Sequence, residues 1–160
     1  MEILTLSHYQ LEVGGNLLLS INQLHLHQGD KVFLIGDNGS GKTSFLQTLI
    51  GERRSYQGQL SLHSDVAYLL QLQAAQNQSG GEKVMASLKA LFQKNASLLI
   101  LDEPTNYLDL VAMEALERCL KQYPYPFVLV SHDQQFVSSV VNRCYVIRDG
   151  QLEEIDKDHF

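Results

Sequence analysis

The sequence predicts an α/β fold, in which a mostly parallel β-sheet is flanked by helices. Continuous apolar runs at 31–35, 98–101 and 127–130 are typical of strands that are buried on both faces of a sheet. Each run is followed by a segment in which apolar residues recur at helical spacing, and this alternation is the pattern of a parallel sheet covered by helices. Residues 1–160 are predicted to form one domain, since domains commonly hold about 100–200 residues.

The remaining elements follow from periodicity and from turn residues. Alternating apolar and polar residues predict half-buried strands, whereas helical spacing predicts amphipathic helices. A further strand is expected at 19–27. Two short strands are expected within 57–70, with turns at Gly58 and His63-Ser64. Strands at 145–147 and 152–155 are expected to form a hairpin around Asp149-Gly150. Helices are expected at 43–50, 80–94, 110–121 and 133–141.

Composition excludes several classes of protein. The chain has 160 residues, a hydrophobic fraction of 44% and a formal net charge of −6, which together are typical of a globular protein and argue against broad binding to nucleic-acid phosphates. No apolar run approaches the roughly 18 residues that a membrane span needs, and the N-terminus lacks the basic start of a signal peptide. We therefore expect a cytoplasmic protein in which Cys119 and Cys144 are free thiols.

A glycine-rich segment between a predicted strand and a predicted helix carries the first functional signal. Gly36–Thr43 reads GDNGSGKT, which matches the pattern G-x-x-x-x-G-K-[ST] in the strand-then-helix context that the pattern requires. Its glycines allow successive N–H groups to point at an anion, and the helix start adds a favourable dipole. Lys42 is expected to meet the β- and γ-phosphates of a nucleotide, and the Thr43 hydroxyl to bind Mg²⁺. The predicted ATP-binding residues here are Gly36, Asp37, Asn38, Gly39, Ser40, Gly41, Lys42, Thr43 and Ser44.

Polar side chains at two other strand ends are expected to meet this segment. Asp102 and Glu103 follow the apolar run 98–101, and the carboxyl ends of parallel strands form the edge at which ligands bind. Asp102 can hold Mg²⁺ opposite Thr43, and Glu103 can polarise the water that attacks the γ-phosphate. His132 follows the run 127–130, so it is expected to reach the same edge.

A second pair of glycines opens the predicted helix at 80–94. Ser79, Gly80, Gly81 and Glu82 offer adjacent N–H groups and a hydroxyl, which could bind a further anion, although a plain capping turn has the same residues. Two phosphate-binding helix starts with one metal site suggest that the second start serves a nucleotide held by another copy or by a partner domain.

Taken together, these segments resemble an ATP-binding cassette over nearly the whole chain. Gly36–Thr43 resembles the Walker A motif of that family, 98–103 its Walker B motif with the catalytic Glu103, and 79–83 its signature. The resemblance implies a P-loop ATPase fold of the cassette type, with a small antiparallel β part, and assigns further roles by position. These are the Q-loop glutamine and metal contact to Gln71, the D-loop to Asn106 and Asp109, the switch histidine to His132, and adenine stacking to Tyr9.

The finer resemblance is to the ABC-F family, including its Vga- and Msr-type antibiotic-resistance branch. The sequences at 80–83, 102–106 and 131–134 resemble the motifs of that family. Members of the family bind the ribosome in the ATP state. From Gln71 to Ser79 there are eight steps (79 − 71), which supply at most about 12 Å of helix. The helical subdomain on which transporters receive their membrane subunit is therefore much reduced, although a transporter ATPase subunit that pairs with a separate membrane protein stays an alternative.

Departures from the family pattern leave further alternatives open. Gln78 stands where the family usually has Leu, and the chain holds one cassette where family members usually hold two. The implied mechanism is a Mg-ATP-driven clamp that needs a second cassette, either in a homodimer or as the missing half of a tandem protein. An isolated cassette is then expected to be a weak ATPase. A non-hydrolysing regulatory cassette is the remaining alternative.

Overall fold

The nine described strands form one sheet in the order β4-β1-β2-β9-β8-β3-β7-β6-β5. The computed structural model describes residues 1–63, 66–70, 86, 90, 96–106 and 108–159. The strands are β1 (Glu2–Val13), β2 (Asn16–His27), β3 (Lys31–Ile35), β4 (Tyr56–Leu62), β5 (Val66–Leu70), β6 (Leu98–Asp102), β7 (Phe127–Val130), β8 (Arg143–Arg148) and β9 (Gln151–Ile155). The helical elements are α1 (Lys42–Leu49), α3 (Leu110–Gln122), α4 (Gln134–Val140) and the 3₁₀ turn η1 (Lys157–His159).

Parallel pairing dominates the centre of the sheet, as the sequence predicts. β3 pairs in parallel with β7 and β8, and β6 with β7 and β5. Antiparallel pairing joins β1 to β2 and β4, and β8 to β9. The two parts meet where β2 pairs with β9, through the single register pair Ser20 and Gln151 and a 2.8 Å hydrogen bond from the Ser20 N–H to the Gly150 carbonyl. The predicted α/β class with a small antiparallel part is confirmed.

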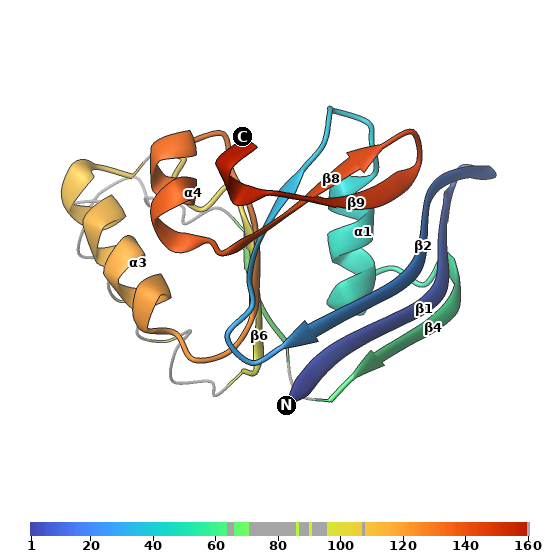
Figure 1. Ribbon diagram of the computed structural model, residues 1–160, viewed down its shortest axis with the longest axis horizontal. Helices are drawn as coiled ribbons and strands as arrows, with labels where there is room; N and C mark the ends of the chain where they lie inside the picture. The colour runs from blue at the N-terminus through green and yellow to red at the C-terminus, as the bar shows by residue number, and fades with distance from the viewer. Residues whose placement is uncertain (64–65, 71–85, 87–89, 91–95, 107, 160) are drawn as a thin grey trace.

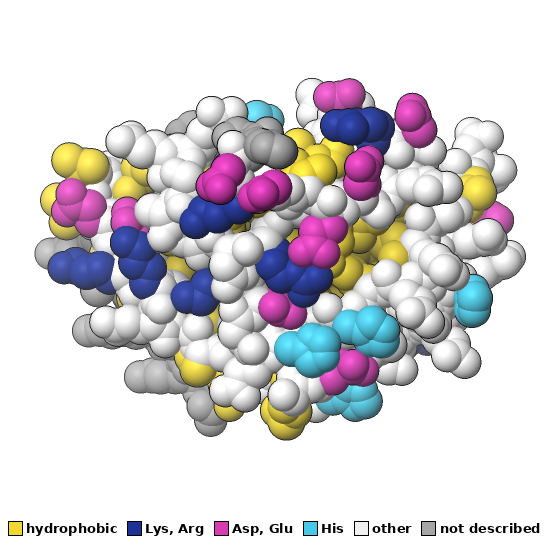
Figure 2. Space-filling view, viewed as in Figure 1, with side chains coloured by type: hydrophobic (Ala, Val, Ile, Leu, Met, Phe, Trp, Pro, Cys, Tyr) yellow, Lys and Arg dark blue, Asp and Glu magenta, His cyan; other side chains and the backbone are white. Residues whose placement is uncertain are grey.

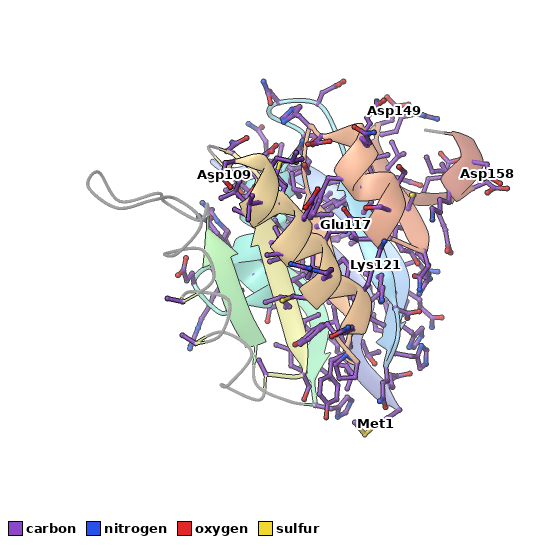
Figure 3. All side chains as sticks on the ribbon, turned by 90° about the vertical axis from the view of Figure 1, so that its left-hand side faces the viewer. Met1, Asp109, Glu117, Lys121, Asp149 and Asp158 are labelled. Carbon is purple, nitrogen blue, oxygen red and sulfur yellow. The ribbon has the colours of Figure 1, made fainter. Side chains whose placement is uncertain are left out.

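Helices cover both faces of the central strands. In Figure 1, α1 lies between the central strands and the curved layer of β1, β2 and β4, whereas α3 and α4 lie on the other side. Figure 3 shows α3 and α4 side by side on that face, with Asp109 at the start of α3 and Met1 at the opposite end of the molecule. The sheet is therefore packed between two apolar clusters.

The two clusters explain the continuous apolar runs. In β6, Leu98 and Ile100 belong to the cluster around α1, whereas Leu99 and Leu101 belong to the cluster under α3 and α4. Successive side chains of a strand point to opposite faces, so a strand covered on both faces needs an apolar residue at every position. β7 follows the same rule.

The N-terminal strand β1 escapes periodicity because its phase changes. Leu4 and Leu6 are buried before His8, and Tyr9 and Leu11 after it. At His8 (φ 50°) a bulge interrupts the pairing with β4, so the buried positions change from Leu4 and Leu6 to Tyr9 and Leu11.

Gly58 is part of the same bulge, and the prediction that it marks a turn between strands is wrong. It lies inside β4 with φ at 93°, and a Cβ atom there would lie 2.2 Å from the His8 carbonyl oxygen. Glycine is therefore required for close approach of two strands. Of the predicted helix 80–94, only Ala86 and Ala90 are described, and both are helical.

Candidate nucleotide-binding site

The phosphate loop, residues Gly36–Thr43, connects the end of β3 to the start of α1 as predicted. Gly39 (φ 84°) and Gly41 (φ 100°) adopt left-handed conformations that favour glycine, and Gly41 is the N-cap residue of α1. Within the described residues, no side chain caps the first turn of α1. Its N–H groups are therefore available to an anion, and the helix dipole favours one there.

The inside of this loop is shaped for small atoms. A Cβ atom on Gly36 would lie 2.6 Å from Ser40 Oγ and 3.4 Å from Lys42 Cδ, so both side chains converge on the space beside this glycine. The Ser40 hydroxyl is buried and has no hydrogen-bond partner among the described residues. A buried hydroxyl without a partner is costly, and a phosphate oxygen would supply the missing acceptor.

A cleft of about 690 Å³ opens from the phosphate loop. Leu17 and Leu18 of β2 line one side, and Arg148, Asp149 and Gly150 at the β8–β9 turn line another. This volume lies in the range of about 300–1,000 Å³ that is usual for small-molecule sites. Sequence reasoning missed this wall, because alternation in a half-buried strand gives no sign of which exposed side chain borders a ligand.

Asp102 lies at the end of β6, where Lys42 and Glu103 both act on its charge. Burial and the neighbouring Glu103 carboxylate raise the pKa of Asp102, while the Lys42 ammonium lowers it. A further cation beside Asp102 would therefore stabilise the ionised form of its carboxyl group. Within the described residues no three His, Cys, Asp or Glu side chains gather to hold a metal. The Asp102 carboxylate and the Thr43 hydroxyl form a donor set that fits Mg²⁺, which typically takes one or two protein oxygens and completes its shell with phosphate and water.

Glu103 and His132 contact each other directly. The His132 Nδ1 atom pairs with Glu103 Oε1, and the His132 N–H donates to Glu103 Oε2 at 3.3 Å. Glu103 has a left-handed backbone (φ 49°) and donates its N–H to the Val130 carbonyl at 2.8 Å, which ties it to the neighbouring strand β7. The Glu103 side chain is only 14% exposed, whereas that of His132 is 81% exposed. The pair thus joins a sheltered carboxylate to an imidazole that a ligand can reach.

Comparisons with known proteins bear on the family and the fold of this chain. The family described as ABC transporter matches residues 19–74. The solved structure of a metal-chelate type ABC transporter in an inward-facing conformation superposes with a TM-score of 0.79 at 14% identity, covering 99% of this chain and 84% of that one. The chain has the fold of an ATP-binding-cassette domain, and residues 19–74 match that family.

The curated proteins of similar sequence include members of the ABC-F family. The ATP-binding protein Uup of Escherichia coli is 30% identical over 87% of the chain, and the ribosome protection protein VmlR of Bacillus subtilis is 30% identical over 96%. The ABC transporter F family member 2 of Arabidopsis thaliana is 26% identical over 98%. The cassette spans 29%, 32% and 30% of these relatives, respectively. In the part of the chain that the structure describes, no helix is long and apolar enough to cross a membrane.

The residues that the resemblance assigns to the D-loop, Asn106 and Asp109, have local structural contacts. Asp109 is the N-cap of α3, and its Oδ1 accepts a hydrogen bond from the Ala112 N–H at 2.8 Å. The Asn106 N–H donates to the Glu103 carbonyl at 3.3 Å. Their predicted contacts with a second cassette stay predictions.

The prediction that Tyr9 stacks on adenine is wrong for this structure. The Tyr9 side chain has no exposed surface. Its ring stacks on Tyr56 at 5.3 Å and meets the edge of Phe45 at 5.7 Å, and its hydroxyl bonds to Thr48 Oγ1 at 2.7 Å. All faces of the ring are therefore occupied by the core beneath α1.

The remaining assigned residues lie outside the described part of the cassette or at its surface. Asp37, Asn38 and Thr43 are exposed, and Ser44 is half-buried. Gln71, Ser79, Gly80, Gly81 and Glu82 lie outside the described residues.

Proposed function

We propose that this cassette binds Mg-ATP and hydrolyses it as part of an ABC-F-type protein. The observation that carries the proposal is the convergence of three strand ends at one edge of the sheet. The phosphate loop follows β3, the Glu103–His132 pair bridges the ends of β6 and β7, and Asp102 lies within the influence of Lys42. A nucleotide anchored in the loop would thus have its terminal phosphate beside an acid–base pair.

In this proposal the phosphate loop binds and orients the triphosphate. The N–H groups at the start of α1, the Ser40 hydroxyl and the Lys42 ammonium would satisfy phosphate oxygens. Thr43 and Asp102 would hold Mg²⁺, which when bound neutralises phosphate charge. Groups that are held in place before the nucleotide arrives would lower the entropic cost of catalysis.

Glu103 would act as the base that polarises the attacking water. Its carboxylate is sheltered, and its second oxygen accepts from the His132 backbone, so its orientation is fixed from two sides. The imidazole of His132 would contact the γ-phosphate, because it is exposed at the same edge. Release of the His132 side chain from Glu103 would then accompany nucleotide binding.

We further propose that two cassettes close over the nucleotide as a clamp. The resemblance assigns Ser79 and Gly81 to the ATP of an opposing cassette, and Gln71 to the metal. Half of each site is then supplied by a partner, in a homodimer or a tandem protein. An isolated cassette would consequently turn over ATP weakly.

The ribosome is the proposed macromolecular target, in the cytoplasm, and antibiotic resistance the proposed setting. The support is the similarity to a relative named as a ribosome protection protein. On the face in Figure 2, basic and acidic side chains lie beside one another and do not gather into a broad basic field. Because the chain also has a formal net charge of −6, ribosome binding would depend on the closed state of the clamp and less on general attraction to phosphate.

The test uses Glu103→Gln, which keeps the side-chain shape and removes the base. With Mg-ATP we expect light scattering to detect a dimer, and single-turnover hydrolysis to fall by about 100-fold or more. The control Lys42→Ala should stay monomeric because it does not retain the nucleotide. Unchanged single-turnover hydrolysis would contradict the role of Glu103. Pelleting of the trapped dimer with ribosomes tests the target, and co-purification with a membrane protein instead would favour a transporter subunit.

A further inference from the structure

A groove of about 700 Å³ lies between the end of α1 and the strand β4, at the opposite end of this helix from the phosphate loop. Half-buried Leu60 and Leu62 of β4 line one wall, and Arg53 and Arg54 in the connection after α1 line another. Figure 1 shows β4 at the outer side of the curved layer, with β1 between it and β2. We call this hollow the edge groove, because β4 is the last described strand of the sheet on this side.

The backbone of β4 has a described hydrogen-bonding neighbour on one side only, β1. In an antiparallel pair, bonded and non-bonded positions alternate. Just beyond the end of β4, the His63 N–H donates to the Ile3 carbonyl at 2.9 Å, so by register Ser61 takes the next bonded position. The N–H and carbonyl groups of Leu60 and Leu62 therefore point away from β1, toward the open edge.

The sequence of β4 does little to protect this edge. Edge strands usually carry charged side chains, proline or bulges that discourage pairing with another chain. β4 reads YQGQLSL, which contains no charged residue and no proline, so the bulge at Gly58 is its one protective device. Beyond the bulge, Gln59–Leu62 pairs regularly with β1 and leaves a regular edge that a further strand can join.

Two arginines give the edge groove a charge opposite to that of the whole chain. The formal net charge is −6, yet no Asp or Glu is found among the described residues that line the groove. The Arg53 guanidinium is held by Gln47 Oε1, 3.1 Å from Nε, and by Ser55 Oγ, 3.3 Å from Nη1, which leaves further N–H groups for a ligand. Arg54 is exposed and has no ion-pair partner among the described residues. Such guanidinium groups bind carboxylates through paired hydrogen bonds.

We propose that the edge groove is a docking site for an extended acidic segment of a partner protein, which joins the sheet as a strand beside β4. Main-chain hydrogen bonds to Leu60 and Leu62 would supply affinity. Alternate side chains of the segment would point into the groove and pack against the same leucines. Acidic residues at the end of the segment beside Tyr56 would meet Arg53 and Arg54. A nucleic-acid backbone would also meet the arginines, but it has no peptide groups to pair with the edge. The docking does not depend on nucleotide binding.

The test is fluorescence anisotropy of the whole chain with a labelled peptide of about nine residues, in which valine alternates with threonine and two glutamates lie at one end. Two versions, with the glutamates at the N-terminal or the C-terminal end, cover both strand directions. We expect one of them to bind saturably. N-methylation of alternate peptide groups should weaken binding by about tenfold or more, because it removes the hydrogen bonds to the edge. Lysines in place of the glutamates should weaken it by a similar factor.

Arg54→Glu should weaken binding of the acidic peptide by about tenfold, since it reverses one charge of the groove. The matched control is Arg118→Glu, which reverses an exposed arginine on α3 and should change binding by less than about twofold. Equal urea midpoints of the two variants would show that the difference is not one of folding, and Mg-ATP affinity should be the same in both. The methylated and lysine peptides test the proposal on the wild-type chain whatever the stability of the variants.

Equal binding of the methylated peptide, or failure of both acidic peptides to bind, would overturn the proposal. So would equal effects of Arg54→Glu and Arg118→Glu. An oligouridylate that binds through Arg54 in place of the peptides would assign the groove to RNA. A dimer in light scattering that Arg54→Glu dissociates would assign it to a second copy of this chain. Either result would replace the proposed peptide segment as the occupant.

Discussion

Replacement of Tyr9 separates a core role from a ligand role, because the two roles predict opposite results. In Tyr9→Phe the lost group is the hydroxyl that bonds to Thr48 Oγ1. Thr48 keeps its own 2.6 Å hydrogen bond to the Phe45 carbonyl, so no polar atom is orphaned. The free energy of unfolding should fall by only about 1 kcal/mol.

Tyr9→Leu removes the ring as well. The ring is fully buried between Phe45 and Tyr56, so the substitution leaves unfilled space in a cluster that joins β1 to α1. We expect a loss of about 2–4 kcal/mol, measured by urea unfolding followed by circular dichroism. Affinity for Mg-ATP, measured on the folded variant, should stay within about twofold of wild type, because the cleft does not include this ring.

A matched control is Tyr125→Leu. Tyr125 is half-buried and meets only the edge of Tyr123 in the described contacts, so its loss should cost about 0.5–1.5 kcal/mol. A stacking role for Tyr9 predicts the reverse pattern, with unchanged unfolding and a loss of about 1–3 kcal/mol in nucleotide binding. That pattern in Tyr9→Leu would refute the assignment of Tyr9 to the core.

Further predictions concern backbone geometry, capping and pH. Gly58→Ala should cost more than about 2 kcal/mol, whereas Gly51→Ala, which also has positive φ but open space around it, should cost about 1 kcal/mol; equal urea midpoints would contradict the bulge. Asp109→Ala should lower the free energy of unfolding by about 1 kcal/mol through loss of the α3 cap, a change visible in thermal melts. Burial raises the pKa of Cys144 to about 11 and that of Tyr9 to about 12, so the folded protein keeps protons that the unfolded chain releases. Between about pH 7 and pH 9 stability should therefore be nearly constant, and it should fall as pH rises further; urea midpoints that rise there would contradict this sign.

The sequence predicts the parallel core well because local and tertiary preferences agree there. β3 and β7 begin and end where the apolar runs do, and the phosphate loop lies between the predicted strand and helix. From the sequence, the Glu103–His132 pair can be predicted only as two residues at strand ends that share an edge of the sheet. Glu103 pairs directly with His132 from a backbone of positive φ, a conformation that no residue preference of glutamate indicates.

The sequence predicts the antiparallel part less well, because its geometry depends on contacts between distant residues. The strand bulge at His8 is stabilised by Gly58, which lies 50 positions later in the chain, so no local window contains both. The family pattern favours Tyr9 as the adenine contact, but burial of its ring depends on contacts with α1 and β4 that the spacing of residues in the sequence does not contain.

The narrow junction between β2 and β9 affects how ligand binding and cohesion are linked. Backbone pairing across it is limited to Ser20 and Gln151, and the cleft lies over the same junction, with Leu17 on one bank and Gly150 on the other. A molecule that fills the cleft touches both parts of the sheet at once. Its binding free energy therefore opposes their separation, so a nucleotide bound in this cleft would strengthen the cohesion between the antiparallel layer and the parallel core.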